Sequence, residues 1–241
     1  MLRGLREAGL TKRQRLIILW SARTRLERLA ALHRGSRLFK WWHYYEIYDR
    51  YFARLRRRNV KLLEIGLGYG GSLQLWRRYF GSSAKIIGID IRETCKNFES
   101  RNTIIEIGSQ DDAEFLNDVA RRHGPFDIVI DDGSHHYNHQ LVTFKTLFPH
   151  ISAEGVYSCE DICTSYWEDE FGGGPRVEHS YVEFVKTLVD ELNAWFWRDS
   201  VEAEPNSLTT SMHAIHFYPA LVIIEKRPTA HPVVTHIGRE V

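Results

Sequence analysis

The feature that most constrains the fold is an alternation of short apolar runs with stretches whose apolar residues recur at helical spacing. Five runs rich in β-branched side chains predict strands, at 60–65, 85–90, 103–107, 126–130 and 155–159. The stretches that separate them carry apolar residues on one helical face, as Leu73, Trp76 and Phe80 do after the first run. Such repeated βα units predict an α/β fold, with a doubly wound, mostly parallel sheet covered by helices on both faces.

The regular pattern ends after the fifth run. Residues 162–176 combine acidic and aromatic side chains with Gly172–Gly174, a composition that favours a mobile lid. A helix facing the core is predicted from Tyr181 to Trp195, where apolar residues return at helical spacing. Two final runs, 214–218 and 220–225, are so close that they must pair antiparallel, which gives a seven-stranded sheet with a C-terminal hairpin.

These patterns divide the chain into three parts. We expect a basic and aromatic helical segment at 1–55, a catalytic domain at 56–228 with the lid-like insertion, and a tail at 229–241. The chain has 241 residues and is 43% hydrophobic, which is enough for one sizeable core and short for two full catalytic domains.

Charge and cysteine content exclude several classes of protein. The 32 basic and 31 acidic side chains leave a net charge of +1, so no global positive field favours nucleic acid. The three cysteines cannot form a complete disulfide framework, which favours the cytoplasm, and Cys159 and Cys163 alone lack the partners of a zinc site. The apolar run Leu16–Trp20 is too short to span a membrane or to form a signal-peptide core.

The positive charge is concentrated at the N-terminus. Residues 1–40 hold eleven Lys and Arg side chains, the last of them Lys40, against Glu7 and Glu27. Such a run most often forms a solvated helix face. An oligomer contact, for instance in a dimer, an anionic membrane surface and an acidic acceptor are the alternatives.

A glycine cluster follows the first predicted strand. Gly66, Gly68 and Gly71 lie between that strand and a helix, where the backbone can approach a ligand closely, and Ser72 follows them. The glycines alone fit both a dinucleotide and S-adenosylmethionine. Glu64 directly precedes them and could accept a hydrogen bond from the ammonium or the sugar of a cationic cofactor.

The next strand ends extend this predicted cofactor site. Asp90 ends the second strand, beside Ile91, and suits two ribose hydroxyls, while Gln110 follows the third strand where an adenine ring would lie. Asp131 ends the fourth strand and completes the expected cofactor set. Open α/β sheets bind ligands at this edge, so a reading in which these residues are only turns and caps is less favoured.

Acidic residues follow the fourth and fifth strands. Asp132, Glu160 and Asp161 stand at neighbouring strand ends, so their carboxylates can converge, and like charges that close need a cation between them. Oxygen donors of this kind suit Mg²⁺ or Mn²⁺ better than zinc. The alternative is a structural role, in which Asp131 and Asp132 cap a helix while Glu160 and Asp161 form surface ion pairs.

Several segments together resemble the metal-dependent sugar O-methyltransferases, which act on macrolide deoxysugars and, in related bacterial enzymes, on polysaccharide precursors. The resemblance covers roughly residues 38–226 and rests on Trp42–Tyr44, Glu64–Ser72, Gly88–Asp90, Asp131–His135, Glu160–Asp161 and His216–Tyr218. It implies a class I methyltransferase sheet and S-adenosylmethionine as the methyl donor.

The resemblance also implies roles for single residues. It assigns Mg²⁺ to Asp132, Glu160 and Asp161 and the general base to His135. His136 follows directly, so the choice between the two histidines rests on the alignment. Larger members of the family carry an extra N-terminal domain, whereas a short basic segment precedes the catalytic domain here, so their oligomeric arrangement is not carried over.

The sequence therefore predicts a cytoplasmic, Mg²⁺-dependent O-methyltransferase that acts on a sugar hydroxyl of a small molecule or an oligosaccharide. A dication lowers the pKa of an acceptor hydroxyl and fixes its position, and His135 then removes the proton. A catechol would chelate the metal equally well. A nicotinamide-dependent oxidoreductase and a non-catalytic binding protein remain as alternatives from other classes.

The aromatic segment 41–52 bears on the acceptor. Its tyrosines fall on one helical stripe, which suits a core, although aromatic rings also stack on sugars. The sequence leaves both roles open, and Trp42, His43 and Tyr44 are candidates to cover the cofactor or the acceptor.

Overall fold

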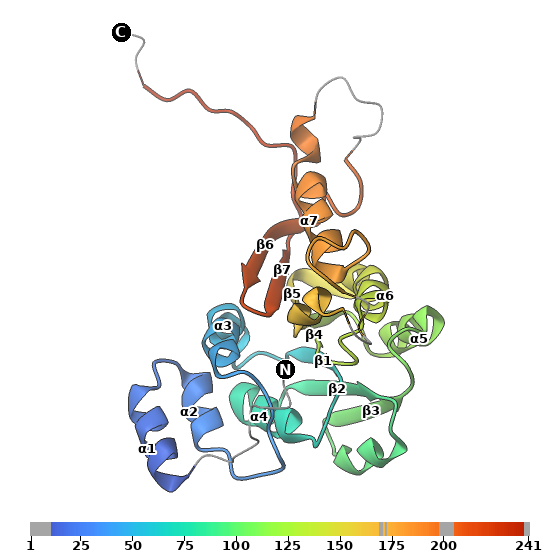
Figure 1. Ribbon diagram of the computed structural model, residues 1–241. Helices are drawn as coiled ribbons and strands as arrows, with labels where there is room; N and C mark the ends of the chain where they lie inside the picture. Colours follow the sequence, from blue (N-terminus) through green and yellow to red (C-terminus); the bar gives the residue numbers. More distant parts are fainter. Residues whose placement is uncertain (1–10, 169–170, 172, 198–204, 239–241) are drawn as a thin grey trace.

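The computed structural model describes residues 11–168, 171, 173–197 and 205–238. These residues contain one seven-stranded sheet in the order β3-β2-β1-β4-β5-β7-β6 (Figure 1). The strands are β1 (Lys61–Ile65), β2 (Lys85–Asp90), β3 (Thr103–Ile107), β4 (Phe126–Asp131), β5 (Ile151–Glu160), β6 (Met212–Tyr218) and β7 (Leu221–Lys226). β1 to β5 pair in parallel, and β7 is antiparallel to β5 and β6, which confirms the predicted fold class.

Helices cover both faces of the sheet (Figure 1). The α-helices are α1 (Lys12–Ser21), α2 (Arg25–Ala31), α3 (Trp42–Phe52), α4 (Gly71–Phe80), α5 (Ala113–His123), α6 (Tyr137–Leu147) and α7 (Tyr181–Leu192). Short 3₁₀ helices are η2 (Ala53–Leu55), η3 (Glu93–Phe98), η4 (Phe148–His150), η5 (Ile162–Tyr166) and η6 (Ala194–Phe196).

Two apolar clusters form the core because successive strand residues point to opposite faces. Leu62 of β1 packs with the aromatic side chains of α3 and with Trp76 of α4. Its neighbour Leu63 packs on the other face with residues from α5, α6 and α7. Trp76 and Phe144 are almost completely buried, one in each cluster. The helices α3 and α4 thus share one side of the sheet, and α5 to α7 share the other.

Two element boundaries differ from the sequence prediction by more than two residues, and the other strand ends differ by at most two. β5 begins at Ile151 instead of residue 155, because Ile151 pairs with Phe126 across a register shift, and Ser152 and Glu154 interrupt the apolar run in the sequence. α7 ends at Leu192 instead of Trp195, since Asn193 follows as the C-cap and the chain continues as the 3₁₀ helix η6.

The segment 162–176 has local structure where it is described. It begins with η5, after which the backbone N–H groups of Gly173 and Gly174 donate to the carbonyls of Trp167 and Ser165. Part of the predicted lid, including Gly172, and the first ten residues of the basic segment lie outside the described residues. None of the helices in the described ranges combines the length and the apolar composition that crossing a bilayer requires.

Candidate active site

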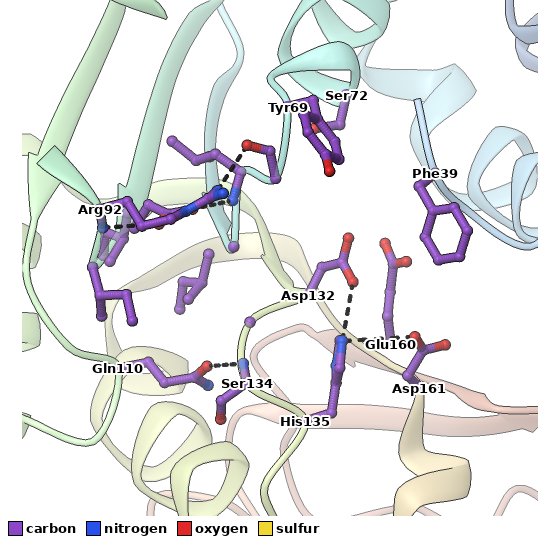
Figure 2. A pocket seen from close by; sticks show the side chains of 18 of the residues that line it. Phe39, Tyr69, Ser72, Arg92, Gln110, Asp132, Ser134, His135, Glu160 and Asp161 are labelled. Carbon is purple, nitrogen blue, oxygen red and sulfur yellow. Dashed lines mark hydrogen bonds and ion pairs between the residues drawn. The ribbon is translucent and has the colours of Figure 1, made fainter. Parts of the chain in front are cut away.

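A cavity of about 880 Å³ opens at the carboxyl ends of the central parallel strands (Figure 2). The loops after β1, β2, β3, β4 and β5 line it together with residues 37–41. The strand order reverses between β1 and β4, and ligands bind at such a switch point in open α/β sheets. The predicted site residues therefore meet at the edge where the strand order places them.

The glycine loop forms one wall of this cavity. Gly66 and Gly68 have positive φ angles, and a Cβ atom at Gly66 would lie 2.0 Å from the carbonyl oxygen of Asp132. A Cβ at Gly68 would meet nothing within 4 Å, because this residue faces open space. Gly71 and Ser72 begin α4 and also line the cavity, so the loop brings a helix N-terminus to the ligand space.

Glu64 lies behind this wall. It is completely buried and is not among the residues that line the cavity, and neither carboxylate oxygen accepts a hydrogen bond within the described structure. The Lys40 ammonium is 3.4 Å from Oε1 of Glu64. The glutamate is thus held near the cavity without contacting its surface.

Asp90 is paired with a cation of its own loop. Its carboxylate accepts hydrogen bonds from the backbone N–H of Leu67 and from the guanidinium of Arg92, which lies on the cavity wall (Figure 2). Burial alone would raise the pKa of Asp90, but these hydrogen bonds lower it to about 2. Ile91 also lines the cavity and is 71% exposed. A ribose would have to displace Arg92 to reach both oxygens of Asp90.

Gln110 lies on the cavity wall, and Asp131 lies buried behind it. Gln110 lines the cavity, where its Oε1 accepts from the backbone N–H of Ser134 at 2.6 Å. Its Nε2 donates to Asp131 at 3.0 Å, and the hydroxyl of Tyr157 donates to the same carboxylate at 3.2 Å. Asp131 is completely buried and does not line the cavity. Its hydrogen bond with Nε2 orients the side-chain amide of Gln110.

The carboxylates predicted to hold a metal gather on the opposite side (Figure 2). Donor atoms of Asp132, His135 and Asp161 lie within 4.8 Å of one another, which fits a divalent cation. Glu160 is not in this group, because its Oε1 accepts from Lys40 at 2.6 Å and from the hydroxyl of Tyr48 at 2.6 Å. The structure thus brings Asp132 and Asp161 together and directs Glu160 toward Lys40.

Lys40 stands among the acidic side chains. Its ammonium donates to Asp132 at 2.7 Å as well as to Glu160, and its side chain is 1% exposed. Burial alone would lower the pKa of Lys40, but the surrounding carboxylates raise it well above its ordinary value. Burial, and repulsion from neighbouring carboxylates, raise the pKa values of Asp132 and Glu160. One ammonium therefore does not balance the local negative charge, which is a setting that favours a further cation.

Helix α3 and its N-cap residue Trp41 supply further donors to the acidic cluster. The Tyr44 hydroxyl and the Trp41 indole N–H both donate to Oδ1 of Asp161 at 2.9 Å. The aromatic stripe of α3 is buried, as a core stripe should be, yet the hydroxyls of Tyr44 and Tyr48 end at the acidic cluster. The core role is thus confirmed for this helix, whereas stacking on a sugar stays a prediction. Of the candidates to cover a ligand, Trp42 packs against the core and the His43 ring bonds the Pro219 carbonyl.

The two adjacent histidines have different surroundings. His135 lines the cavity, and its Nε2 is 3.9 Å from Asp132 Oδ1 and 3.7 Å from Asp161 Oδ2. His135 and Asp161 both have positive φ angles, a strained conformation for residues with side chains that is often found at functional sites. His136 caps α6 through its Nδ1 and is not among the lining residues.

Sequence reasoning missed three contributors to this site. Lys40 belongs to the basic N-terminal segment, Arg92 lies in no motif, and no local pattern distinguishes His139, which bonds Ser134, from the other histidines. Lys40 and Asp132 are 92 positions apart in the sequence, so no local pattern could reveal their contact. The basic residue next to the aromatic segment was the only available signal.

Comparison with known proteins agrees with this geometry. Residues 63–162 match a family model described as a methyltransferase domain. The chain therefore contains a methyltransferase domain. Its sheet has the class I methyltransferase fold, as the resemblance implied.

Two relatives of this chain are O-methyltransferases, one of a rhamnosyl tetracenomycin and one of mycinamicin VI. It is 40% identical over 211 residues to the 8-demethyl-8-(2-methoxy-alpha-L-rhamnosyl)-tetracenomycin-C 3'-O-methyltransferase of Streptomyces olivaceus, a match that covers 83% of this chain and 53% of the relative. It is 37% identical to the mycinamicin VI 2''-O-methyltransferase of Micromonospora griseorubida, over 74% of this chain and 47% of that one. The chain thus spans about half the length of these relatives.

A solved structure gives the same result. The MycE methyltransferase of the mycinamycin biosynthetic pathway, in complex with Mg and SAH, superimposes with a TM-score of 0.79 and 33% identity. The match covers 92% of this chain and 59% of that one. These names point to sugars of antibiotics and not to the polysaccharide precursors that the resemblance also included.

Proposed function

We propose that this methyltransferase transfers a methyl group from S-adenosylmethionine to a sugar hydroxyl of a glycosylated small molecule, with the help of Mg²⁺. The observation that carries the proposal is the opening of the glycine loop and of the Asp132, His135 and Asp161 cluster into one cavity. The sugar O-methyltransferases among the relatives support the acceptor class.

The cavity has two sides with different chemistry. On the donor side, Gly66 and Gly68 allow close approach of a ligand to the backbone, and Gln110 offers polar atoms near the third strand. On the other side, Asp132 and Asp161 provide oxygen ligands that suit Mg²⁺. A nucleoside lying along the glycine loop would therefore point its reactive end toward the carboxylates.

The chemistry of the acidic side concerns the acceptor hydroxyl. When bound, Mg²⁺ supplies a Lewis acid that lowers the pKa of a hydroxyl and fixes its position. His135 accepts the hydroxyl proton on Nε2, between Asp132 and Asp161. The acceptor oxygen then bonds to the methyl carbon while the carbon–sulfur bond breaks, and the sulfonium becomes a neutral thioether.

The entrance of the cavity carries aromatic rings that suit a glycoside. Phe39 and Tyr69 are 73% and 57% exposed, and the Arg37 guanidinium lies 5.9 Å and 5.1 Å from their ring centroids. Exposed rings at a cavity offer stacking surfaces for a sugar ring or for a planar aglycone. A catechol would be held by the same metal, so the acceptor has to be tested directly.

A methyl-transfer screen with labelled donor tests the proposal. The panel contains L-rhamnosyl glycosides of aromatic polyketides, macrolide glycosides, free oligosaccharides and catechols, each with Mg²⁺ and with EDTA. We expect label in the glycosides only when Mg²⁺ is present. Transfer to catechols alone would replace the acceptor class, and full turnover in EDTA would remove the metal from the mechanism.

A further inference from the structure

The unusual feature of the acidic cluster is the lysine at its centre. Lys40 is 1% exposed, and its ammonium reaches Asp132 at 2.7 Å, Glu160 at 2.6 Å and Glu64 at 3.4 Å. These three carboxylates come from the ends of β1, β4 and β5, and Lys40 comes from the segment that leads into α3. A single side chain thus connects three strand ends to the N-terminal helices.

The Lys40 ammonium offsets the electrostatic repulsion among these buried carboxylates. Buried carboxylates repel one another strongly, and removing one partner of a buried ion pair is much more destabilising than removing a surface pair. In the described part of the chain, two side chains form ion pairs with Glu64, Asp132 or Glu160. One is Lys40, and the other is the His135 ring, which reaches Asp132. The convergence of these acids therefore depends on Lys40 whenever the divalent cation is absent.

We propose that Lys40 is a positioning residue that acts as a built-in counter-ion, keeping Asp132 and Glu160 convergent and the domain folded before a divalent cation binds. The metal part of this inference rests on the proposed function. Tyr48 reinforces the arrangement, because its hydroxyl donates to the same Glu160 oxygen.

The Lys40 ammonium stabilises the metal-free acidic cluster but opposes the binding of a metal ion there. A dication held by Asp132 would lie close to the Lys40 ammonium, which donates to Oδ2 of the same carboxylate, and like charges at that range repel each other. Lys40 therefore stabilises the metal-free protein and weakens its affinity for the metal. A residue that served only for packing would not change the two properties in opposite directions.

Lys40→Met tests this inference, with Lys226→Met as the matched control. Lys226 also carries a partly buried ammonium, but it donates to the backbone carbonyls of Phe148, Pro149 and Ile151 and to no carboxylate in the described structure. The melting temperature Tm of each full chain is measured in EDTA and in Mg²⁺, and Mn²⁺ binding is measured by calorimetry.

We expect Lys40→Met to lower Tm in EDTA by about 10 °C, to recover much of that loss in Mg²⁺, and to bind Mn²⁺ about tenfold more tightly. Lys226→Met should lower Tm equally in both buffers and leave the Mn²⁺ affinity unchanged. A Lys40→Met protein whose Tm loss is the same with and without metal, or whose Mn²⁺ affinity is unchanged or weaker, would overturn the inference.

A double variant covers the case in which Lys40→Met does not fold. Lys40→Met combined with Glu160→Gln removes one positive and one negative charge, so it should recover a folded protein in EDTA. No recovery would count against the counter-ion role. Failure of the wild-type protein to bind Mn²⁺ would instead remove the metal from the proposed function, while the difference in Tm between the two lysine variants in EDTA would still decide whether Lys40 is the counter-ion.

Discussion

Arg92 and Lys40 both pair with carboxylates at the cavity, but Arg92 does so from the surface and Lys40 from the interior. The Arg92 side chain is 48% exposed and bonds Asp90, two positions before it, whereas the Lys40 side chain is 1% exposed and bonds acids that lie far away in the sequence. Figure 2 shows Arg92 on the cavity wall away from the acidic cluster.

The two sides of the cavity therefore hold their carboxylates in different ways before a ligand binds. On the donor side, a half-exposed guanidinium holds Asp90, and we expect its displacement to cost little because solvent screens the arginine. On the acidic side, a buried ammonium holds the carboxylates together and cannot leave without moving residues 37–41. We therefore expect changes on the acidic side to have large effects and changes around Arg92 to have small ones.

The largest effect is expected from His135→Ala. Loss of the proposed general base should lower the methyl-transfer rate by about 10²–10⁴-fold, while the dissociation constant for the donor stays within about threefold of wild type. Single-turnover kinetics and calorimetry measure the two quantities. His136→Ala is the matched control, because His136 caps α6 outside the cavity lining. An equal rate loss in both variants would remove His135 from the mechanism.

Tyr48→Phe tests the interior side without changing charge. The buried hydroxyl donates to Glu160, so its removal should lower the free energy of unfolding in EDTA by about 1.5–3 kcal/mol, as for a hydrogen bond to a charged group. Tyr51→Phe removes a hydroxyl that bonds another tyrosine, Tyr218, and should have a smaller effect of about 1 kcal/mol. Urea denaturation measures both, and the reverse order would contradict the importance assigned to the acidic cluster.

Arg92→Ala tests the surface side. If Asp90 binds the ribose, removing the guanidinium that occupies it should tighten donor binding by about fivefold, equivalent to about 1 kcal/mol. Arg122→Ala, which breaks surface ion pairs with Glu106 and Asp118, should leave donor affinity unchanged. Weaker donor binding by Arg92→Ala would show that the arginine itself contacts the donor.

The smallest expected effect is on the pH dependence of stability in acid. Because the pKa of Asp90 is lowered to about 2, its ionised form contributes stability that is fully present above about pH 4 and is lost as the pH falls through about 2. Arg92→Ala should therefore be slightly less stable than wild type above pH 4, and the difference should shrink toward pH 2. Denaturation between pH 2 and 6 measures this trend, and a difference that grows in acid would contradict it.

The same contrast explains what the sequence could predict. The strands were predictable because their apolar runs are β-branched and local, and β2 and β3 have the predicted bounds. The convergence of Asp132 and Asp161 was predictable because parallel strands end at the same edge of the sheet, and the structure brings these two side chains together there. Neither Lys40 nor the orientation of Glu160 could be predicted, because both depend on contacts between distant segments that leave no periodic pattern.

The most direct test of the account is a crystal structure of the chain with S-adenosylhomocysteine and Mn²⁺, using the anomalous signal of manganese. We predict a manganese peak in contact with carboxylate oxygens of Asp132 and Asp161, and the nucleoside along Gly66–Ser72 with its sulfur facing the ion. Manganese bound elsewhere, or a nucleoside outside this cavity, would contradict the account.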